Sequence, residues 1–189
     1  SELTTISEAD APQYSAIAAA GSLSPYTTTS ATWQPGWPFK PDIVMEGGNA
    51  AIEPMGFACS MDSLSLLTTG HEPHDRLFTL SWATSAATAL AAGMGARIQA
   101  AYPTFWPETV RALMVHSARW TQPMLHAYTP NGLRNKDTLR QLLRHCGYGV
   151  PGLERALYSA RNSLTLIVQD QLQPYHKVDG TVKTRDMHL

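Results

Sequence analysis

The sequence predicts an α/β domain in which a mainly parallel sheet is flanked by helices. Short apolar runs of strand length alternate along the chain with longer stretches of helical spacing. The 189 residues are 43% apolar and 15% charged, which suffices for one core of ordinary domain size. The formal net charge is −1 and no block of Lys and Arg occurs. We therefore expect no nucleic-acid partner and no membrane partner.

Two short buried strands with an irregular loop between them are expected near the start of the chain. Residues 14–20 and 42–45 are apolar runs bounded by turn residues. Residues 22–40 are rich in Ser, Thr, Pro and Gly, which predicts a surface loop. Residues 1–13 are polar and are also expected to form a loop.

The longest expected helix lies in the middle of the chain. Residues 46–76 show no clear periodicity of apolar residues. Within this segment, residues 60–69 fit either a short helix or a loop. Residues 77–82 alternate in the manner of a strand. The run 85–101 is rich in Ala, the best helix former, and Pro103 marks its end.

Three more helices and a strand are expected beyond it. Pro107 suits an early helix position, because its missing N–H costs nothing there. The next helix is expected from Asp137 as a cap to Gly147 as a stop, and another over 152–159. The apolar run 164–168 predicts a strand.

The domain is expected to occupy residues 1–169. After it the chain turns polar and Pro174 appears, so 170–189 is expected to be a linker or the start of a following domain. Both ends of the sequence look like cuts through a longer chain. No signal-peptide pattern and no run of membrane-spanning length occurs in these residues, which slightly favours the cytoplasm.

Ser85 is the clearest candidate for a catalytic residue, because it lies where the predicted strand ends and the Ala-rich helix begins. Backbone N–H groups in the first turn of a helix are unpaired, and the helix dipole adds positive charge there. Both would stabilise an oxyanion beside a serine nucleophile. From position alone, a simple N-cap role for Ser85 or Thr84 remains the alternative.

Four blocks of sequence resemble the subtilase family of serine proteases, in the family's order. The first is Lys40-Pro-Asp-Ile-Val44, and the second is Thr84-Ser85-Ala86-Ala87 before the Ala- and Gly-rich helix. The third block spans 100–118, a helix pair with a proline turn, and the fourth is the Gly-rich stretch 146–157. The resemblance covers roughly residues 40–157 and implies the C-terminal part of a subtilisin-like catalytic domain.

The resemblance implies a Ser-His-Asp mechanism with Ser85 as the catalytic nucleophile and with Thr84 and Ala83 at the substrate groove. The Asp and His partners and the oxyanion asparagine have no counterpart in this sequence. The implied partners are a peptide or protein substrate and the N-terminal part of the same protease. No cofactor and no metal is implied, and the fragment alone is expected to be inactive.

The sequence also departs from the family pattern. Ala83 replaces a glycine, Ala89 replaces a proline, and Met45-Glu46 replaces Ala-Pro. The methyl of Ala83 would lie beside the substrate groove. Ala83 and the missing Asp and His partners support an alternative hypothesis, a catalytically incompetent interaction module built on the same fold.

Several other side chains have the chemistry of possible sites. His71 and His74 fit a metal site less well than a solvated loop, because the proline between them makes a shared helical face unfavourable. His116 is expected to be a structural or surface residue, and Asp42 is a weaker candidate for holding a cation. Cys59 and Cys146 are expected to be free thiols. The tryptophans are expected to be packing or loop anchors; they are Trp33, Trp37 and Trp106.

Overall fold

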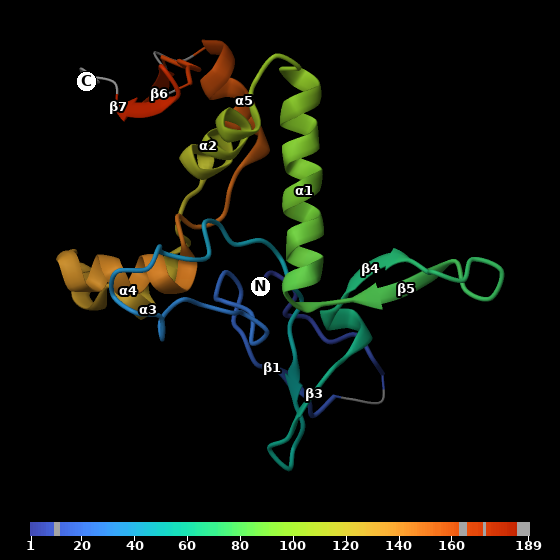
Figure 1. Ribbon diagram of the computed structural model, residues 1–189. Helices are drawn as coiled ribbons and strands as arrows, with labels where there is room; N and C mark the ends of the chain where they lie inside the picture. Colours follow the sequence, from blue (N-terminus) through green and yellow to red (C-terminus); the bar gives the residue numbers. More distant parts are fainter. Residues whose placement is uncertain (10–11, 163–165, 172, 185–189) are drawn as a thin grey trace.

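A computed structural model describes residues 1–9, 12–162, 166–171 and 173–184 of the chain. Its most prominent element is the long helix α1, Ala83–Ala101, with a helical layer beside one end and β-structure at the other (Figure 1). No described helix is both long enough and apolar enough to cross a membrane.

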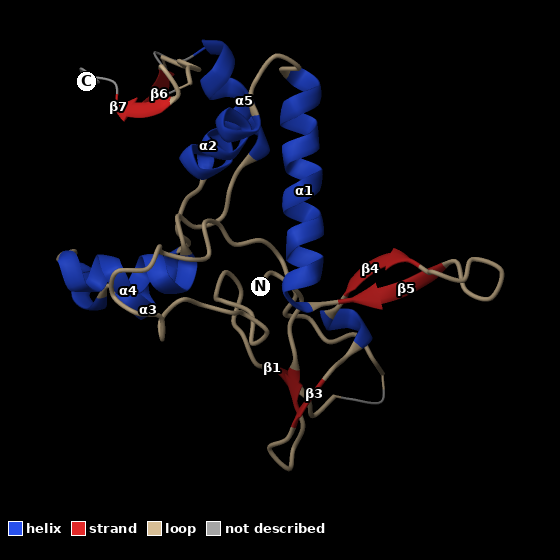
Figure 2. Ribbon diagram, viewed as in Figure 1, coloured by secondary structure: helices blue, strands red, loops and turns tan. Residues whose placement is uncertain are grey.

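The β-structure of the described residues consists of three small antiparallel sheets (Figure 2). The first contains β1 Ser15–Ala16, β2 Ala51–Ile52 and β3 Ala58–Cys59. The second is the hairpin of β4 Leu66–Thr69 and β5 Phe78–Ser81, in which Leu67 lies opposite Leu80. The third is the hairpin of β6 Tyr175–Val178 and β7 Thr181–Thr184.

The predicted parallel sheet is absent from the residues that the structure describes, where every strand pair is antiparallel. The run 42–45 does not form a strand. Instead, the Val44 N–H donates to the Gly149 carbonyl at 3.0 Å, and the Tyr148 N–H donates to the Asp42 carbonyl at 2.8 Å. Of the run 14–20, only two residues pair in a sheet. Residues 166–168 of the last predicted strand are not in a strand, and 163–165 lie outside the described residues.

Besides α1, the described ranges contain four α-helices. They are α2 Pro107–Ser117, α3 Gln122–Tyr128, α4 Lys136–Cys146 and α5 Leu153–Asn162. Short 3₁₀ turns cover Asp62–Leu64 and Pro130–Gly132. Pro107 is the first residue of α2, as predicted. The cap of α4 is Asn135 rather than Asp137, because Asn135 Oδ1 accepts from the N–H groups of Asp137 and Thr138.

Two apolar clusters hold the helices together. In the first, the stripe of Met94 and Ile98 on α1 packs against Val110 and Leu113 of α2 and Ala156 of α5. The second cluster joins α3 and α4 through three buried residues, which are Met124, Leu142 and Cys146. Only the C-terminal half of α1 therefore has a full helical partner, and its N-terminal half stands free beside the β-structure (Figure 1).

The two cysteines are free, as predicted, and differ in environment. Cys146 is fully buried, and burial raises the pKa of its thiol to about 12. Because the thiolate is the reactive form, Cys146 is expected to resist alkylation in the native protein at pH 8, while the half-buried Cys59 is labelled first. Mass spectrometry after iodoacetamide treatment measures this order. Equal labelling of both residues in folded protein would contradict the buried position of Cys146.

Candidate active site

The N-terminus of α1 begins directly after strand β5. Trp82 is the N-cap residue, has extended backbone angles and provides no side-chain cap. Ser85 is therefore the third residue of the helix, so neither Ser85 nor Thr84 serves as its cap. The alternative that Ser85 is only an N-cap is wrong for this reason.

The Ser85 hydroxyl is open to solvent. Ser85 is exposed, and its side chain has no hydrogen-bond partner among the described residues. The backbone N–H groups of Thr84 and Ser85 lie in the first turn, where a helix supplies no acceptor. The first turn carries no acidic residue, so the positive end of the helix dipole is not neutralised there. This arrangement can stabilise an anion next to a serine oxygen.

The turn before Ser85 is fixed by close contact between two backbone segments. The Ala83 N–H donates to the Gly47 carbonyl at 2.7 Å. A Cβ at Gly47 would lie 3.0 Å from the Ala83 carbonyl oxygen, and one at Gly48 would lie 3.2 Å from Trp82 Cβ. Gly48 also has a φ of +80°, a conformation that other residues rarely adopt. The Gly-Gly pair thus allows residues 46–49 to support the first turn of α1.

Ala83 has a φ of +66°, which places an alanine in the left-handed region. A Cβ there costs roughly 1–2 kcal/mol, so Ala83→Gly is expected to stabilise the protein by about 1 kcal/mol. The matched control Ala89→Gly, at an exposed site inside the same helix, should instead destabilise by about 1 kcal/mol. Urea denaturation of both variants measures the difference. Destabilisation of similar size in both would show that Ala83 is not strained.

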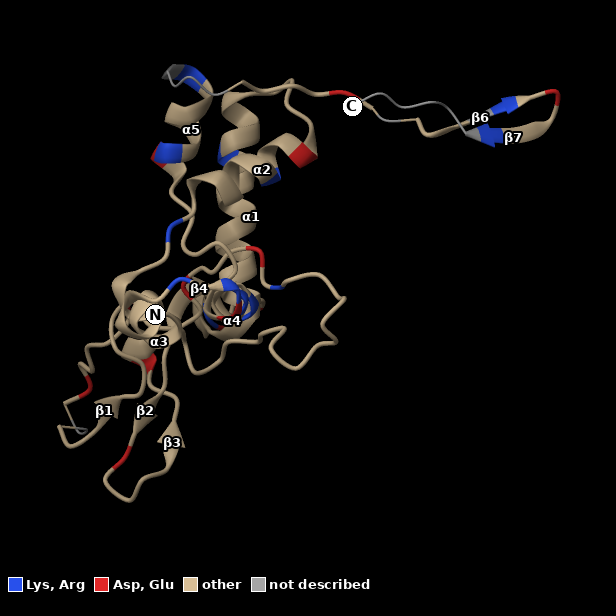
Figure 3. Ribbon diagram, turned by 90° about the vertical axis from the view of Figure 1, so that its left-hand side faces the viewer, with Lys and Arg blue, Asp and Glu red and all other residues tan. Residues whose placement is uncertain are grey.

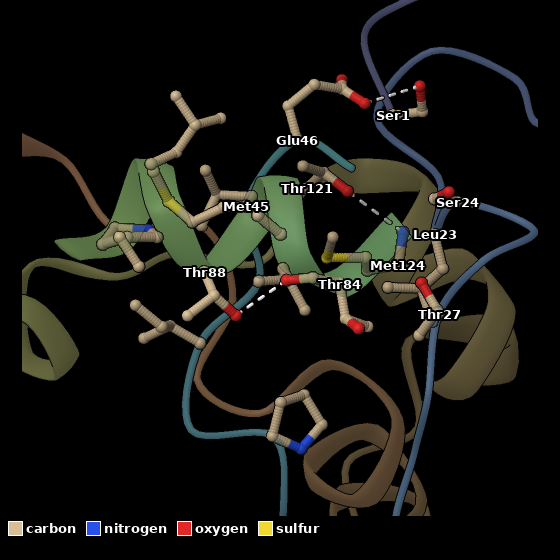
Figure 4. A pocket seen from close by; sticks show the side chains of 18 of the residues that line it. Ser1, Leu23, Ser24, Thr27, Met45, Glu46, Thr84, Thr88, Thr121 and Met124 are labelled. Carbon is tan, nitrogen blue, oxygen red and sulfur yellow. Dashed lines mark hydrogen bonds between the residues drawn. The ribbon is translucent and has the colours of Figure 1, made fainter. Parts of the chain in front are cut away.

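A pocket of about 630 Å³ lies along the neighbouring face of α1 (Figure 4). Helix α1 contributes Thr84, Ala87, Thr88 and Ala91 to its wall, and Thr88 Oγ1 donates to the Thr84 carbonyl at 2.7 Å. The opposite wall comes from residues 21–28 and 40–46. Of the three predicted site residues, only Thr84 lines this pocket. Ala83 lies half-buried beside Gly47, and Ser85 lies on the adjoining face of the helix.

Glu46 also lines this pocket, and its carboxylate lies beside Ser1 (Figure 4). Its carboxylate accepts from the Gly48 N–H at 2.8 Å, from Ser1 Oγ at 3.0 Å and from the Glu2 N–H. Burial alone would raise the pKa of Glu46, but these hydrogen bonds outweigh burial and lower it. Glu46 is therefore ionised at neutral pH and fixes the segment that precedes the Gly-Gly pair.

Asn49 is a buried supporting residue that the sequence did not identify. Only 1% of it is exposed, and its amide nitrogen donates to the carbonyls of Ala18 and Leu3 at 2.9 and 2.8 Å. Its side-chain oxygen accepts from the N–H groups of Ala18 and Ala50 at 3.1 and 2.9 Å. Asn49 thus ties the start of the chain to the segment under Ala83. Nothing in a single sequence marks this role, because the four bonds arise only from tertiary contact.

Asp42 forms ion pairs with two basic side chains. Its carboxylate lies 2.7 Å from Lys40 Nζ and 3.0 Å from Arg111 of α2. Burial raises the pKa of Asp42, but the bonds and charges of Lys40 and Arg111 outweigh it and lower the pKa. The Asp42 cation hypothesis is thus disfavoured, since these partners occupy the carboxylate that would hold the ion.

The histidines do not gather into a site in the described part of the chain. His71 is exposed and lies 3.6 Å from Glu72, and no group of three or more metal-ligating side chains is found in the described ranges. His116 is exposed on α2, in agreement with the surface role expected for it.

Comparison with known proteins identifies the family of the chain. The family model for the subtilase family matches residues 2–149, so the chain belongs to the subtilase family, a family of serine peptidases of the α/β class. The chain is also 30% identical over 141 residues to the uncharacterized protein y4bN of Sinorhizobium fredii (strain NBRC 101917 / NGR234). That match covers 72% of this chain and 31% of the relative, so the chain spans about a third of its length. No solved structure matches.

Proposed function

We propose that this chain is the C-terminal part of a subtilase catalytic domain and that Ser85 is the nucleophile of a serine endopeptidase. The observation that carries the proposal is an exposed serine hydroxyl in the uncapped first turn of α1. Thr84 and Ala83 would border the scissile bond. The substrate class is peptides and proteins, and the chemistry needs no metal or cofactor.

The proposed reaction follows from this placement. Ser85 Oγ attacks the carbonyl carbon of the scissile peptide bond and gives its proton to a histidine base. The negative charge that develops on the carbonyl oxygen is stabilised by the Ser85 N–H at the positive end of the helix. The histidine then protonates the leaving amine, and water releases the acyl group from Ser85. The histidine, its aspartate and an oxyanion asparagine would come from another part of the full-length protein.

The exposed apolar surface of helix α1 supports the proposal that the rest of the catalytic domain comes from another part of the full-length protein. Its 19 residues carry one charge, Arg97, yet its N-terminal half exposes Ala89 and Leu90 to solvent. A helix that is apolar on all sides is normally buried. We therefore propose that the N-terminal part of the same protease covers this half of α1. The mainly parallel sheet expected for the domain would then lie in that part of the protein.

One observation favours a second function. The methyl group of Ala83 lies in the strained turn next to Ser85, where the family pattern has glycine. If this methyl group blocks the substrate, the domain would be an inactive interaction module that binds peptides without cleaving them.

Incubation of the folded full-length protein with an unfolded protein substrate separates the two functions. The protease proposal predicts the appearance of new α-amino groups and of discrete fragments over time. The Ala83→Gly variant should retain or increase this cleavage. Folded full-length protein that produces no fragments, either as wild type or as Ala83→Gly, would favour the interaction module.

A further inference from the structure

The loop over residues 30–40 is held in a defined shape although it lies on the surface. Ser30 is fully buried, and its N–H donates to the carbonyls of Lys40 and Arg144 at 3.1 and 3.0 Å. The Lys40 N–H donates back to Ser30 Oγ at 2.9 Å, which closes the base of the loop. The guanidinium of Arg144 donates to the carbonyls of Ser30 and Gln34 at 2.6 and 3.3 Å.

The loop over residues 30–40 exposes three aromatic side chains to solvent. Trp33, Trp37 and Phe39 are 41%, 55% and 38% exposed. The two indoles contact each other edge to face, with ring centroids 5.7 Å apart, and Arg144 lies 5.2 Å from the Phe39 ring. Exposed aromatic residues held rigidly are typical of binding surfaces, because little conformational entropy is lost when a partner covers them.

The surroundings of the loop are basic. Residues 31–39 carry no charge, and residues 118–151 contain five Lys or Arg and one acidic residue, although the whole chain has net charge −1. Lys136 and Arg140 lie four residues apart on α4, one turn before the buried Arg144, so they form a basic stripe that leads to the aromatic loop. Figure 3 shows this loop projecting beside α4. The complementary partner is therefore acidic and carries apolar side chains.

The loop also starts near the candidate active site. Thr27, Thr28 and Lys40, which flank the two ends of the loop, line the same pocket as Thr84 of α1. A chain bound on the aromatic loop could thus extend across the pocket toward the first turn of α1.

We propose that Trp33, Trp37 and Phe39, together with the basic stripe of α4, form an accessory surface that binds an acidic segment with apolar side chains in a protein substrate. This inference rests on the proposed protease function, which it extends by naming the substrate class.

The test uses full-length protein that carries Ser85→Ala, so that the ligand is not cleaved. Fluorescence anisotropy follows a labelled ten-residue peptide of Glu, Leu and Phe, and a second peptide in which Lys replaces Glu. The acidic peptide is expected to bind more tightly, and added salt should weaken it. Adding Trp33→Ala and Trp37→Ala should weaken binding at least about tenfold, and Lys136→Glu with Arg140→Glu at least about fivefold. Trp106→Ala, another exposed tryptophan, is the matched control and should bind unchanged.

Equal binding of the two peptides would overturn the inference, as would full affinity in the variant lacking Trp33 and Trp37. Binding of RNA or anionic vesicles without any binding of the acidic peptide would overturn it as well. The experiment distinguishes a failure of the protease proposal from a failure of the binding-surface proposal. Peptide binding without hydrolysis by the wild-type protein would refute the protease and leave the surface in place, whereas hydrolysis without preferential binding would refute the surface alone.

Discussion

Ser85→Ala in the full-length protein is expected to lower the turnover of peptide hydrolysis by about 10⁶-fold, the loss that removal of the catalytic serine causes in subtilisin. The physical reason is that no acyl-enzyme forms without the hydroxyl, and the helix N–H groups alone stabilise the transition state only partly. Initial rates with an unfolded protein substrate measure the effect.

The matched control for this prediction is Ser60→Ala, which removes an exposed hydroxyl outside the described helices. It should keep the wild-type rate. A Ser85→Ala protein that retains more than a few per cent of the wild-type turnover would show that another residue is the nucleophile.

Asn49→Leu is expected to lower the free energy of unfolding by about 3–5 kcal/mol. The change removes the partner of the Ala18 N–H and of the Ala18 and Leu3 carbonyls, and each buried polar group left unsatisfied costs about 1–3 kcal/mol. Urea denaturation measures the loss.

Asn135→Ala supplies the comparison for Asn49→Leu. Asn135 is an exposed helix cap, so its loss should cost only about 1 kcal/mol. If Asn49→Leu is no more destabilising than Asn135→Ala, the buried amide does not hold the segment under α1.

The helices could be predicted from sequence because their signals are local. Alanine content predicted α1, proline at the first position marked the start of α2, and Gly147 ends α4 as expected, with a φ of +54°. The cap at Asn135 could have been found, since asparagine is as good a cap as the aspartate chosen instead. Helix α3 was missed because its seven residues are too short for a clear apolar period.

The sheet could not be predicted in the same way, because strand pairing depends on partners far away in the sequence. The run 42–45 has the composition of a buried strand, yet its hydrogen bonds go to Tyr148 and Gly149. The candidate site likewise has one part that local sequence predicts and another part that depends on distant contacts. The position of Ser85 at the start of a helix follows from local sequence, whereas Asn49 and the support from Gly47 depend on contacts that appear only in the folded chain.

The most direct measurement is to locate the covalent adduct after the folded full-length protein reacts with a fluorophosphonate probe. We expect a single phosphonylated residue, Ser85, in tryptic peptides analysed by tandem mass spectrometry, and no adduct in Ser85→Ala. An adduct on a different residue, or folded protein that stays unlabelled at Ser85, would contradict the assignment of the helix-end serine as the nucleophile.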